Sequence, residues 1–439
     1  MKRKVRIKLK EIYDSIISNG ILKNSFITLS SQTIAGGLSF LATLIIIRDI
    51  GTTGNGIIAI VTSYATLFNG LFNFQSYNAL IKYGAEAIEK KDDYLYKMYI
   101  KTALIQDVIT AIIAFIVGKC ALNWCANIMG WNNEMLLYIN IFLITILINI
   151  TGSLNAILRL NDKFHITGLV AIISNVVKLV LIFIAYILHL QIYYYVLIEI
   201  IQIFVQNVLR LYYTVQCFKE NNMSFMDILK TKLYLDYAFT KFNIYNNLVS
   251  AVDIPAGQAV NLIINKLLGI NAVGVYNLFV KAGGIIAQVT DAIGQAIFPE
   301  FSIMVARNNI AYVLNICKKM LKTINLISII IAVFSVLLYK IWMPFLMDVN
   351  FNYALAFAIY VLFLGFSGSL IPLHQFFVSV NLVHYNLYIA IICNILYIIL
   401  LIVLGNLFDL IGIMIAMLLQ SLLVCGCKII ILKDKEYWI

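Results

Sequence analysis

Long apolar stretches constrain this chain more than any other feature. Each is about 20 residues or slightly longer, which is the length a helix needs to cross the hydrocarbon of a bilayer. Because 62% of the residues are hydrophobic and 12% are charged, a soluble globular fold is excluded. The sequence predicts an all-α membrane protein with twelve transmembrane helices at 25–47, 57–81, 98–120, 135–158, 165–188, 191–215, 243–265, 273–298, 322–345, 352–378, 384–405 and 410–431.

The basic residues predict the orientation. Of the 32 lysines and arginines, Arg48, Lys119, Lys266 and Lys340 fall on the side opposite the N-terminus, and Lys178 and Lys281 fall inside helices. The others lie on the N-terminal side, so the positive-inside rule places both termini in the cytoplasm. The net charge of +11 is therefore interpreted as contacts with anionic membrane lipids, and no nucleic-acid partner is expected.

A short glycine-containing motif occurs twice. Arg48-Asp49-Ile50-Gly51 with Gly56 is matched by Lys266-Leu267-Leu268-Gly269 with Gly274, 218 positions later. That offset is close to half the chain, which indicates duplication of a six-helix unit. Six helices per half bring both halves in from the same side, so we expect two parallel six-helix bundles around a central cavity.

The repeat divides the chain into five parts. These are a cytoplasmic amphipathic basic segment at 1–23, an N-terminal lobe at 24–215, a cytoplasmic inter-lobe linker at 216–242, a C-terminal lobe at 243–432 and a cytoplasmic tail at 433–439.

Four predicted helices carry polar residues at steps of three and four. Such stripes cost free energy against lipid, so they are expected to face protein or water. They favour a shared polar cavity, although small and polar residues also join helices to one another. The stripes are Ser25, Thr28, Gln32, Gly36, Ser39 and Thr43; Thr62, Thr66, Asn69, Asn73 and Ser76; Asn243, Asn246, Ser250, Asp253, Gly257 and Asn261; and Asn277, Lys281, Gly284, Gln288, Asp291 and Gln295.

Charged side chains inside membrane helices are expected to be paired or functional, because each costs roughly 2.5–3.5 kcal/mol at the bilayer centre. Lys178 and Glu199 fall at similar depth on consecutive helices, and Asp107 is not far from that level. We interpret these three as a structural ion pair within the first half, with a proton relay or a substrate contact as the alternative. Lys281, Asp253 and Asp291 fall on the cavity stripes, where a functional role is favoured.

No catalytic or metal-binding pattern accompanies these charges. The four histidines have no metal-ligand spacing, and no GxSxG, HExxH or phosphate-binding loop is present. The loops opposite the termini are too short to hold the catalytic loop of a glycan polymerase or ligase. The sequence therefore predicts a protein that is not an enzyme and has no cofactor.

Three stretches carry a family resemblance. Ile45-Ile46-Ile47-Arg48-Asp49-Ile50-Gly51, Asn78-Ala79-Leu80-Ile81-Lys82-Tyr83-Gly84 and the segment from Lys266 to Tyr276 resemble the polysaccharide-transport flippases of the multidrug/oligosaccharidyl-lipid/polysaccharide exporter superfamily. The resemblance implies two rocking six-helix lobes with a cavity lined by the first, second, seventh and eighth helices. It implies translocation of a lipid-linked oligosaccharide, usually on undecaprenyl diphosphate, across the inner membrane of a bacterium for O-antigen or capsule synthesis.

The resemblance also suggests roles for the candidate residues. Lys281 would bind the diphosphate with help from Arg48 and Lys266, and Asn69, Asn73, Gln288, Gln295 and Gln32 would bind sugar. Asp253 and Asp291 would balance charge or bind H⁺ or Na⁺ as the driving ion. The glycan polymerase and export machinery are expected partners. A cation-coupled small-molecule antiporter of the same superfamily is the alternative function.

Overall fold

The computed structural model describes residues 20–233, 236–251, 254–307, 309–380, 382–435 and 437. Throughout these residues the secondary structure is helical and no strand occurs. The first half contains α2 (Gly20–Phe72), α3 (Tyr77–Glu89), α4 (Asp93–Met129), α5 (Asn133–Phe142), α6 (Ile144–Ile148), α7 (Gly152–Leu160), α8 (Phe164–Ile187), α9 (Ile192–Glu220) and α10 (Phe225–Lys230). The second contains α11 (Tyr237–Ala251), α12 (Ile254–Leu268), α13 (Ile270–Ala306), α14 (Ile310–Leu337), α15 (Tyr339–Trp342), η1 (Met343–Phe345), α16 (Phe351–Ser369), α17 (Ile371–Ser379) and α18 (Val383–Asp434).

Eight helical stretches in the described residues are long and apolar enough to cross a membrane. This confirms an all-α, multi-spanning membrane protein. The count of twelve spans stays a prediction. Two of the eight stretches, within α2 and α18, each contain two helices joined at a sharp bend.

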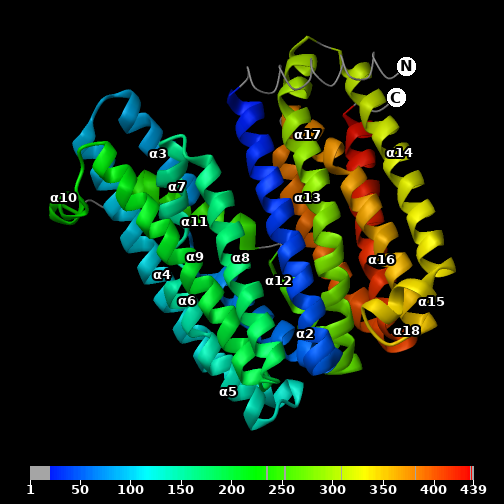
Figure 1. The fold of residues 1–439 in the computed structure, drawn as a ribbon. Helices are drawn as coiled ribbons and strands as arrows, with labels where there is room; N and C mark the ends of the chain where they lie inside the picture. Colours follow the sequence, from blue (N-terminus) through cyan, green and yellow to red (C-terminus); the bar gives the residue numbers. More distant parts are fainter. Residues whose placement is uncertain are drawn as a thin grey trace, which may run out of the picture.

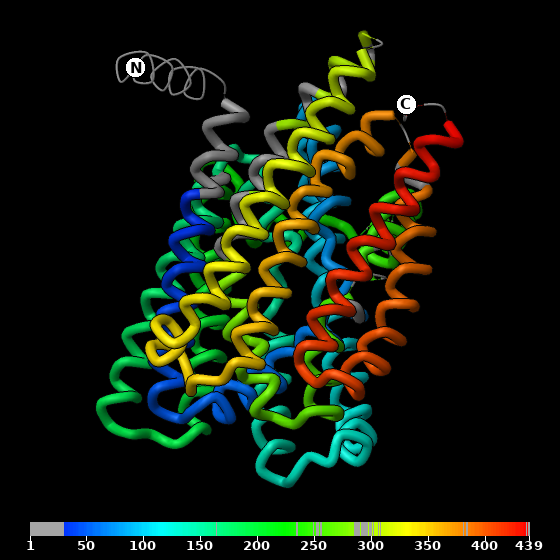
Figure 2. The backbone as a smooth tube through the Cα atoms, turned by 90° about the vertical axis from the view of Figure 1, so that its right-hand side faces the viewer, coloured from blue at the N-terminus to red at the C-terminus, as the bar shows by residue number. Residues whose placement is uncertain are grey.

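The bend in α2 lies at Gly51, whose φ of 71° and ψ of 177° suit glycine and almost no other residue. The bend in α18 lies at Phe408 and Asp409. Figure 2 shows the chain reversing there between the orange and the red arm. The predicted spans left residues 48–56 between two helices, but helix continues on both sides of a single glycine.

Two predicted spans are interrupted inside the first half. The expected helix 57–81 stops at Phe72 and resumes at Tyr77, and the expected helix 135–158 is interrupted at 149–151. Breaks at this depth leave backbone N–H groups without helical partners, and lipid offers none.

Asp107 accepts hydrogen bonds from free backbone N–H groups at both breaks, which corrects its predicted role. This buried carboxylate accepts hydrogen bonds from the backbone N–H of Ser76 at 2.7 Å and of Ser153 at 2.8 Å. Those two residues lie at the starts of α3 and α7, where free N–H groups and the helix dipole favour an anion. Asp107 therefore holds two helix ends and does not join the ion pair of Lys178 and Glu199.

Asn73 has a similar structural role in this conformation, and its predicted contact with sugar stays a prediction. Its side chain is buried at the end of α2 and donates to Asn69 Oδ1 at 2.9 Å and to the Asn149 carbonyl at 3.2 Å. It thus connects the two interrupted helices to each other.

The helices form two bundles that touch at one end (Figure 1). We define the first bundle as α2–α9 and the second as α12–α18. They meet where α2 bends at Gly51 and where α12 passes into α13, which we name the closed end. They diverge toward the opposite end, which we name the splayed end and which holds the Gly20 end of α2 and the Asp434 end of α18.

The helix α11 packs on the first bundle although the sequence assigned residues 243–251 to the second lobe. Asn243 Nδ2 donates to Ser76 Oγ at 3.0 Å, and Phe239 is buried against the Tyr99 ring, with centroids 5.4 Å apart. The next helix, α12, packs on α2, α13 and α18. The chain therefore changes bundle between α11 and α12, close to the kink predicted at Pro255.

We predict that Asp107→Ala lowers the stability of the folded protein strongly. It would leave two buried N–H groups unpaired, at a cost of about 1–3 kcal/mol each. Thermal unfolding in detergent should show a large fall in Tm, and Asp107→Asn should show a smaller one, because its amide oxygen still accepts. Equal Tm values for Asp107→Ala and the parent protein would contradict this role.

Candidate functional site

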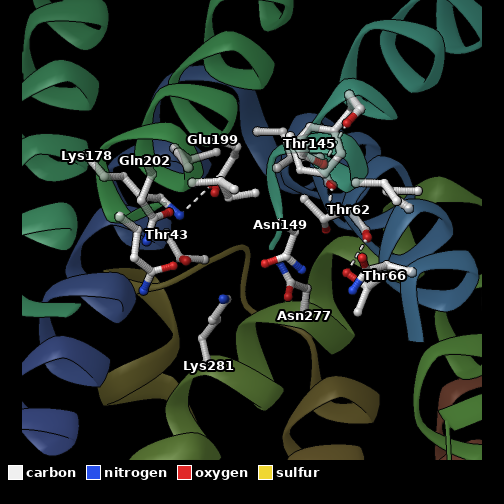
Figure 3. Close-up of a pocket in the computed structure, with 18 of the residues that line it drawn as sticks. Thr43, Thr62, Thr66, Thr145, Asn149, Lys178, Glu199, Gln202, Asn277 and Lys281 are labelled. Carbon is white, nitrogen blue, oxygen red and sulfur yellow. Dashed lines mark hydrogen bonds and ion pairs between the residues drawn. The ribbon is translucent and has the colours of Figure 1, made fainter. Parts of the chain in front are cut away.

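A polar cavity of about 400 Å³ lies between the first bundle and α13 of the second (Figure 3). Its walls come from both arms of α2 and from α5, α6, α8, α9 and α13. Hydroxyl, amide and charged groups make up most of the lining, which is unusual for the interior of so apolar a chain. The lining residues are Thr43, Ile46, Asn55, Ile58, Thr62, Ala65, Thr66, Asn69, Phe142, Thr145, Ile146, Asn149, Lys178, Glu199, Gln202, Ile203, Gln206, Asn277 and Lys281.

Three charged side chains lie in this cavity. Lys178 Nζ of α8 lies 2.5 Å from Glu199 Oε1 of α9, and this ion pair agrees with the sequence prediction. Lys281 projects from α13 toward them (Figure 3). Among the residues described, no hydrogen bond or ion pair of the Lys281 ammonium is present. The cavity therefore presents an ammonium group that is free to bind an anion.

A second cavity of about 400 Å³ extends the polar surface along the first arm of α2. It shares Lys281 and Gln202 with the first cavity and is lined also by Gln32, Ser39 and Asn175. Since Gln32 lies nearer the Gly20 end of α2, the polar surface continues toward the splayed end. Lys281 thus lies at the junction of the two cavities.

The repeated motif forms the closed end. Gly51 and Gly269 adopt nearly the same conformation, with φ of 71° and 86° and ψ of 177° and 175°. Each turns the chain between a helix that arrives at the closed end and one that leaves it. The two copies of the motif therefore form two equivalent turns.

The second glycine of each motif brings the two departing helices into backbone contact. A Cβ added at Gly56 would lie 2.1 Å from the carbonyl oxygen of Ile270, and one at Gly274 would lie 1.8 Å from that of Thr52. Ile270 follows Gly269 and Thr52 follows Gly51, so the contact is reciprocal, as in a two-fold interface. Only glycine permits this approach.

Hydrogen bonds reinforce the contact. Asn55 Nδ2 donates to the Gly274 carbonyl at 2.8 Å, and Asn277 Nδ2 donates to Asn55 Oδ1 at 3.2 Å. The Thr52 hydroxyl contacts the Asn271 side chain. Asn55 and Asn277 also line the cavity, so these bonds form its floor.

The structure separates the predicted substrate-binding residues. Lys281 and Asn69 line the first cavity, and Gln32 lines the second. Arg48 and Lys266 are exposed at the closed end and line neither of these two cavities. Their predicted contact with substrate stays a prediction, and Arg48 lines a separate, mostly apolar cavity.

Four of the predicted site residues have side chains that the structure does not describe. Asp253 lies outside the described residues, and so do the side chains of Gln288, Asp291 and Gln295. Their proposed roles in binding sugar, balancing charge or binding a driving ion stay predictions.

Part of the cavity wall was missed by the sequence analysis. Thr145 and Asn149 line it from α6 and the break after it, whereas no described lining residue comes from α11 or α12. On α9, Glu199, Gln202 and Gln206 recur at steps of three and four, so a polar stripe was present in the sequence. The stripe is shorter than the four that were used to predict the cavity, and Glu199 was assigned mainly to the ion pair with Lys178.

Lys428 also differs from its prediction. It was counted as a cytoplasmic anchor, but it is 1% exposed inside the second bundle. Its ammonium contacts the His374 ring nitrogen and lies 4.8 Å from the centre of the Phe377 ring. The positive-inside count placed it by sequence position, whereas the aromatic residues of α17 bury it.

One known protein family matches most of this chain. Residues 21–305 match the family described as polysaccharide biosynthesis protein. The chain belongs to this family. Comparison with curated proteins finds no match.

Solved structures show the fold of this family member. An inward-facing multidrug resistance transporter of the MATE family, in the MOP superfamily, aligns with a TM-score of 0.68 at 15% identity, covering 94% of this chain and 98% of that chain. The lipid II flippase MurJ, in an inward closed conformation, aligns with a TM-score of 0.68 at 13% identity, covering 94% and 89%. An outward-facing MATE transporter aligns with a TM-score of 0.61 at 13% identity, covering 95% of each chain. At these identities the likeness establishes the fold alone, which this chain shares with the three transport proteins.

We predict that Gly274→Ala opens the closed end. The added methyl group would collide with the Thr52 carbonyl, and overpacking of this kind costs about 1–3 kcal/mol. The equilibrium would shift about 5- to 150-fold toward separation of the two bundles at that end. Labelling of Thr62→Cys, in a variant without the seven native cysteines, with an impermeant maleimide applied from the closed-end side measures this.

Gly37→Ala is the matched control, because a Cβ at Gly37 meets no atom within 4 Å. It should leave the cysteine as protected as in the parent. Equal protection in Gly274→Ala would show that the glycine contact does not hold the bundles together.

Proposed function

We propose that this protein is a flippase that moves a polyprenyl-diphosphate-linked oligosaccharide from the inner to the outer leaflet. The observation that carries the proposal is a polar cavity, walled by two apolar bundles, in which the Lys281 ammonium forms no hydrogen bond or ion pair with a described residue. The family description, polysaccharide biosynthesis, supports a glycan substrate.

The three parts of such a substrate have different needs. The diphosphate needs a cation, and lysine is a suitable point charge for phosphate. The sugars need hydrogen-bond donors and acceptors, which Asn69, Gln202 and Asn149 supply. The polyprenyl chain needs only hydrocarbon, so it stays in the bilayer while the polar parts cross between the bundles.

The charge of the cavity favours this substrate over the cationic drugs of the alternative antiporter. Among the described lining residues, Lys178 and Lys281 are cationic and Glu199 is the one anion. A cavity with a positive balance attracts phosphate and repels an organic cation. The lipid II flippase MurJ, which shares the fold, is named for a lipid-linked substrate.

The cycle proposed is alternating access between the two bundles. With the N-terminus in the cytoplasm, the splayed end faces inward and the glycine contact at Gly56 and Gly274 closes the outer side. Binding of substrate then favours the arrangement in which the splayed end closes and the glycine contact separates. A ligand shifts this equilibrium only by binding one arrangement more tightly.

The cellular setting follows from this function. We place the protein in the cytoplasmic membrane of a bacterium, with undecaprenyl diphosphate as carrier and O-antigen or capsule as the polymer supplied. The polymerase that consumes the flipped unit is the proposed partner, and H⁺ or Na⁺ the proposed driving ion.

Deletion of the gene tests the function directly. We expect a lipid-linked oligosaccharide to accumulate on the cytoplasmic face, where mass spectrometry of the extracted lipids identifies it. Restoring the gene should clear it. If the lipids do not change and export of a cationic dye falls instead, the antiporter alternative is correct.

We predict that Lys281→Ala fails to restore export in the deletion strain. Loss of a hydrogen bond to a charged group costs about 1.5–3 kcal/mol, which corresponds to a fall of tenfold or more in export. The amount of surface glycan, normalised to the amount of protein in the membrane, measures this effect. Lys281→Arg should retain part of the activity.

Lys319→Ala is the control, since Lys319 is an exposed lysine of α14 in the same bundle. It should export normally. Normal export by Lys281→Ala would refute the assignment of Lys281 to the phosphate.

A further inference from the structure

The ion pair of Lys178 and Glu199 is accessible from the cavity, which a purely structural contact does not require. Both residues line the cavity, where their side chains are 5% and 13% exposed. Gln202 and Gln206 continue the same wall along α9. An anion that enters the cavity therefore reaches Lys178 as well as Lys281.

The two lysines belong to different bundles. Lys178 lies on α8 of the first bundle and Lys281 on α13 of the second, and they face each other across the cavity (Figure 3). Glu199 neutralises Lys178 in the empty protein. The charge arrangement is thus one free ammonium in the second bundle and one occupied ammonium in the first.

We infer that Lys178 is a second phosphate-binding lysine and that Glu199 is the carboxylate which an incoming phosphate group displaces from it. This inference rests on the proposed function and assigns one lysine to each phosphate group of its diphosphate. The ligand has two linked phosphate groups, one bound by Lys281 and the other by Lys178.

The displacement follows from ordinary electrostatics. Carboxylate and phosphate oxygens both accept hydrogen bonds from an ammonium group, so the ligand and Glu199 compete for Lys178. The competition weakens binding, because the ion pair must break first. It also speeds release, because Glu199 recaptures Lys178 when the phosphate leaves. Glu199 therefore keeps the site from trapping its substrate.

The position of the lysines links binding to movement of the bundles. A diphosphate that contacts both lysines holds the two bundles together at the level of the cavity. A single phosphate group contacts one lysine and gives no such link. Only the diphosphate thus favours closure of the splayed end, since a ligand must bind one arrangement better to shift the equilibrium.

Isothermal titration of the purified full-length protein in detergent with inorganic pyrophosphate and with inorganic phosphate tests this. We expect pyrophosphate to bind the parent protein about tenfold more tightly than phosphate. Glu199→Gln should tighten pyrophosphate binding about tenfold, since a charged competitor is lost. Lys178→Ala should weaken it by a similar factor, and the double variant should behave like Lys178→Ala.

Export in cells gives the second measurement. Glu199→Gln should slow glycan export although it binds pyrophosphate more tightly, because release becomes slower. Lys319→Ala should change neither quantity. A purely structural ion pair predicts instead that Glu199→Gln lowers protein stability without tightening binding.

Three results would overturn the inference. They are unchanged or weaker pyrophosphate binding by folded Glu199→Gln, equal affinities of the parent for phosphate and pyrophosphate, and normal export by Glu199→Gln. If Glu199→Gln does not fold, Glu199→Asp replaces it, with a smaller tightening expected and no change counting against the inference. Each result leaves the proposed function standing if deletion of the gene still accumulates a lipid-linked oligosaccharide.

Discussion

Hydrocarbon offers no hydrogen-bond partner, and this constraint governs the structure. Every polar group in the membrane-spanning helices must find a partner in the protein or face water. The interruptions after Phe72 and before Gly152 are possible because the buried carboxylate of Asp107 accepts from both new helix ends. Another set of hydroxyl and amide groups lines the cavity between the bundles. Structural anchoring and a binding site thus arise from the same requirement.

The contact between the bundles depends on glycine, which has no side chain, more than on polar groups that find partners. Gly56 and Gly274 let two helices approach until backbone meets backbone, and the bonds of Asn55 cover the exposed carbonyl and amide groups. The contact is self-complementary, because each helix places its glycine against the backbone of the other. Buried apolar side chains of both bundles pack around it in one continuous core.

Charge placement connects the fold to the proposed substrate. Lys178 and Glu199 neutralise each other within the first bundle, whereas Lys281 of the second faces them without a partner in the described part of the chain. The two cavity lysines therefore differ: Lys178 of the first bundle is paired with Glu199, and Lys281 of the second is not. The cavity gains a positive balance although each bundle alone has little charge at this depth.

The sequence by itself determined the class of protein, the duplicated glycine motif and the cavity positions of Lys281, Asn69 and Gln32, because these depend on hydropathy, spacing and helical periodicity. The family was indicated by the resemblance of three short motifs to known flippases. Only the tertiary structure decided that Asp107 and Asn73 are anchors, that Lys428 is buried and that α6, α8 and α9 wall the cavity. Periodicity shows which side of a helix is polar. It cannot show which neighbour that side meets, because the neighbour is set by packing between segments far apart in the chain.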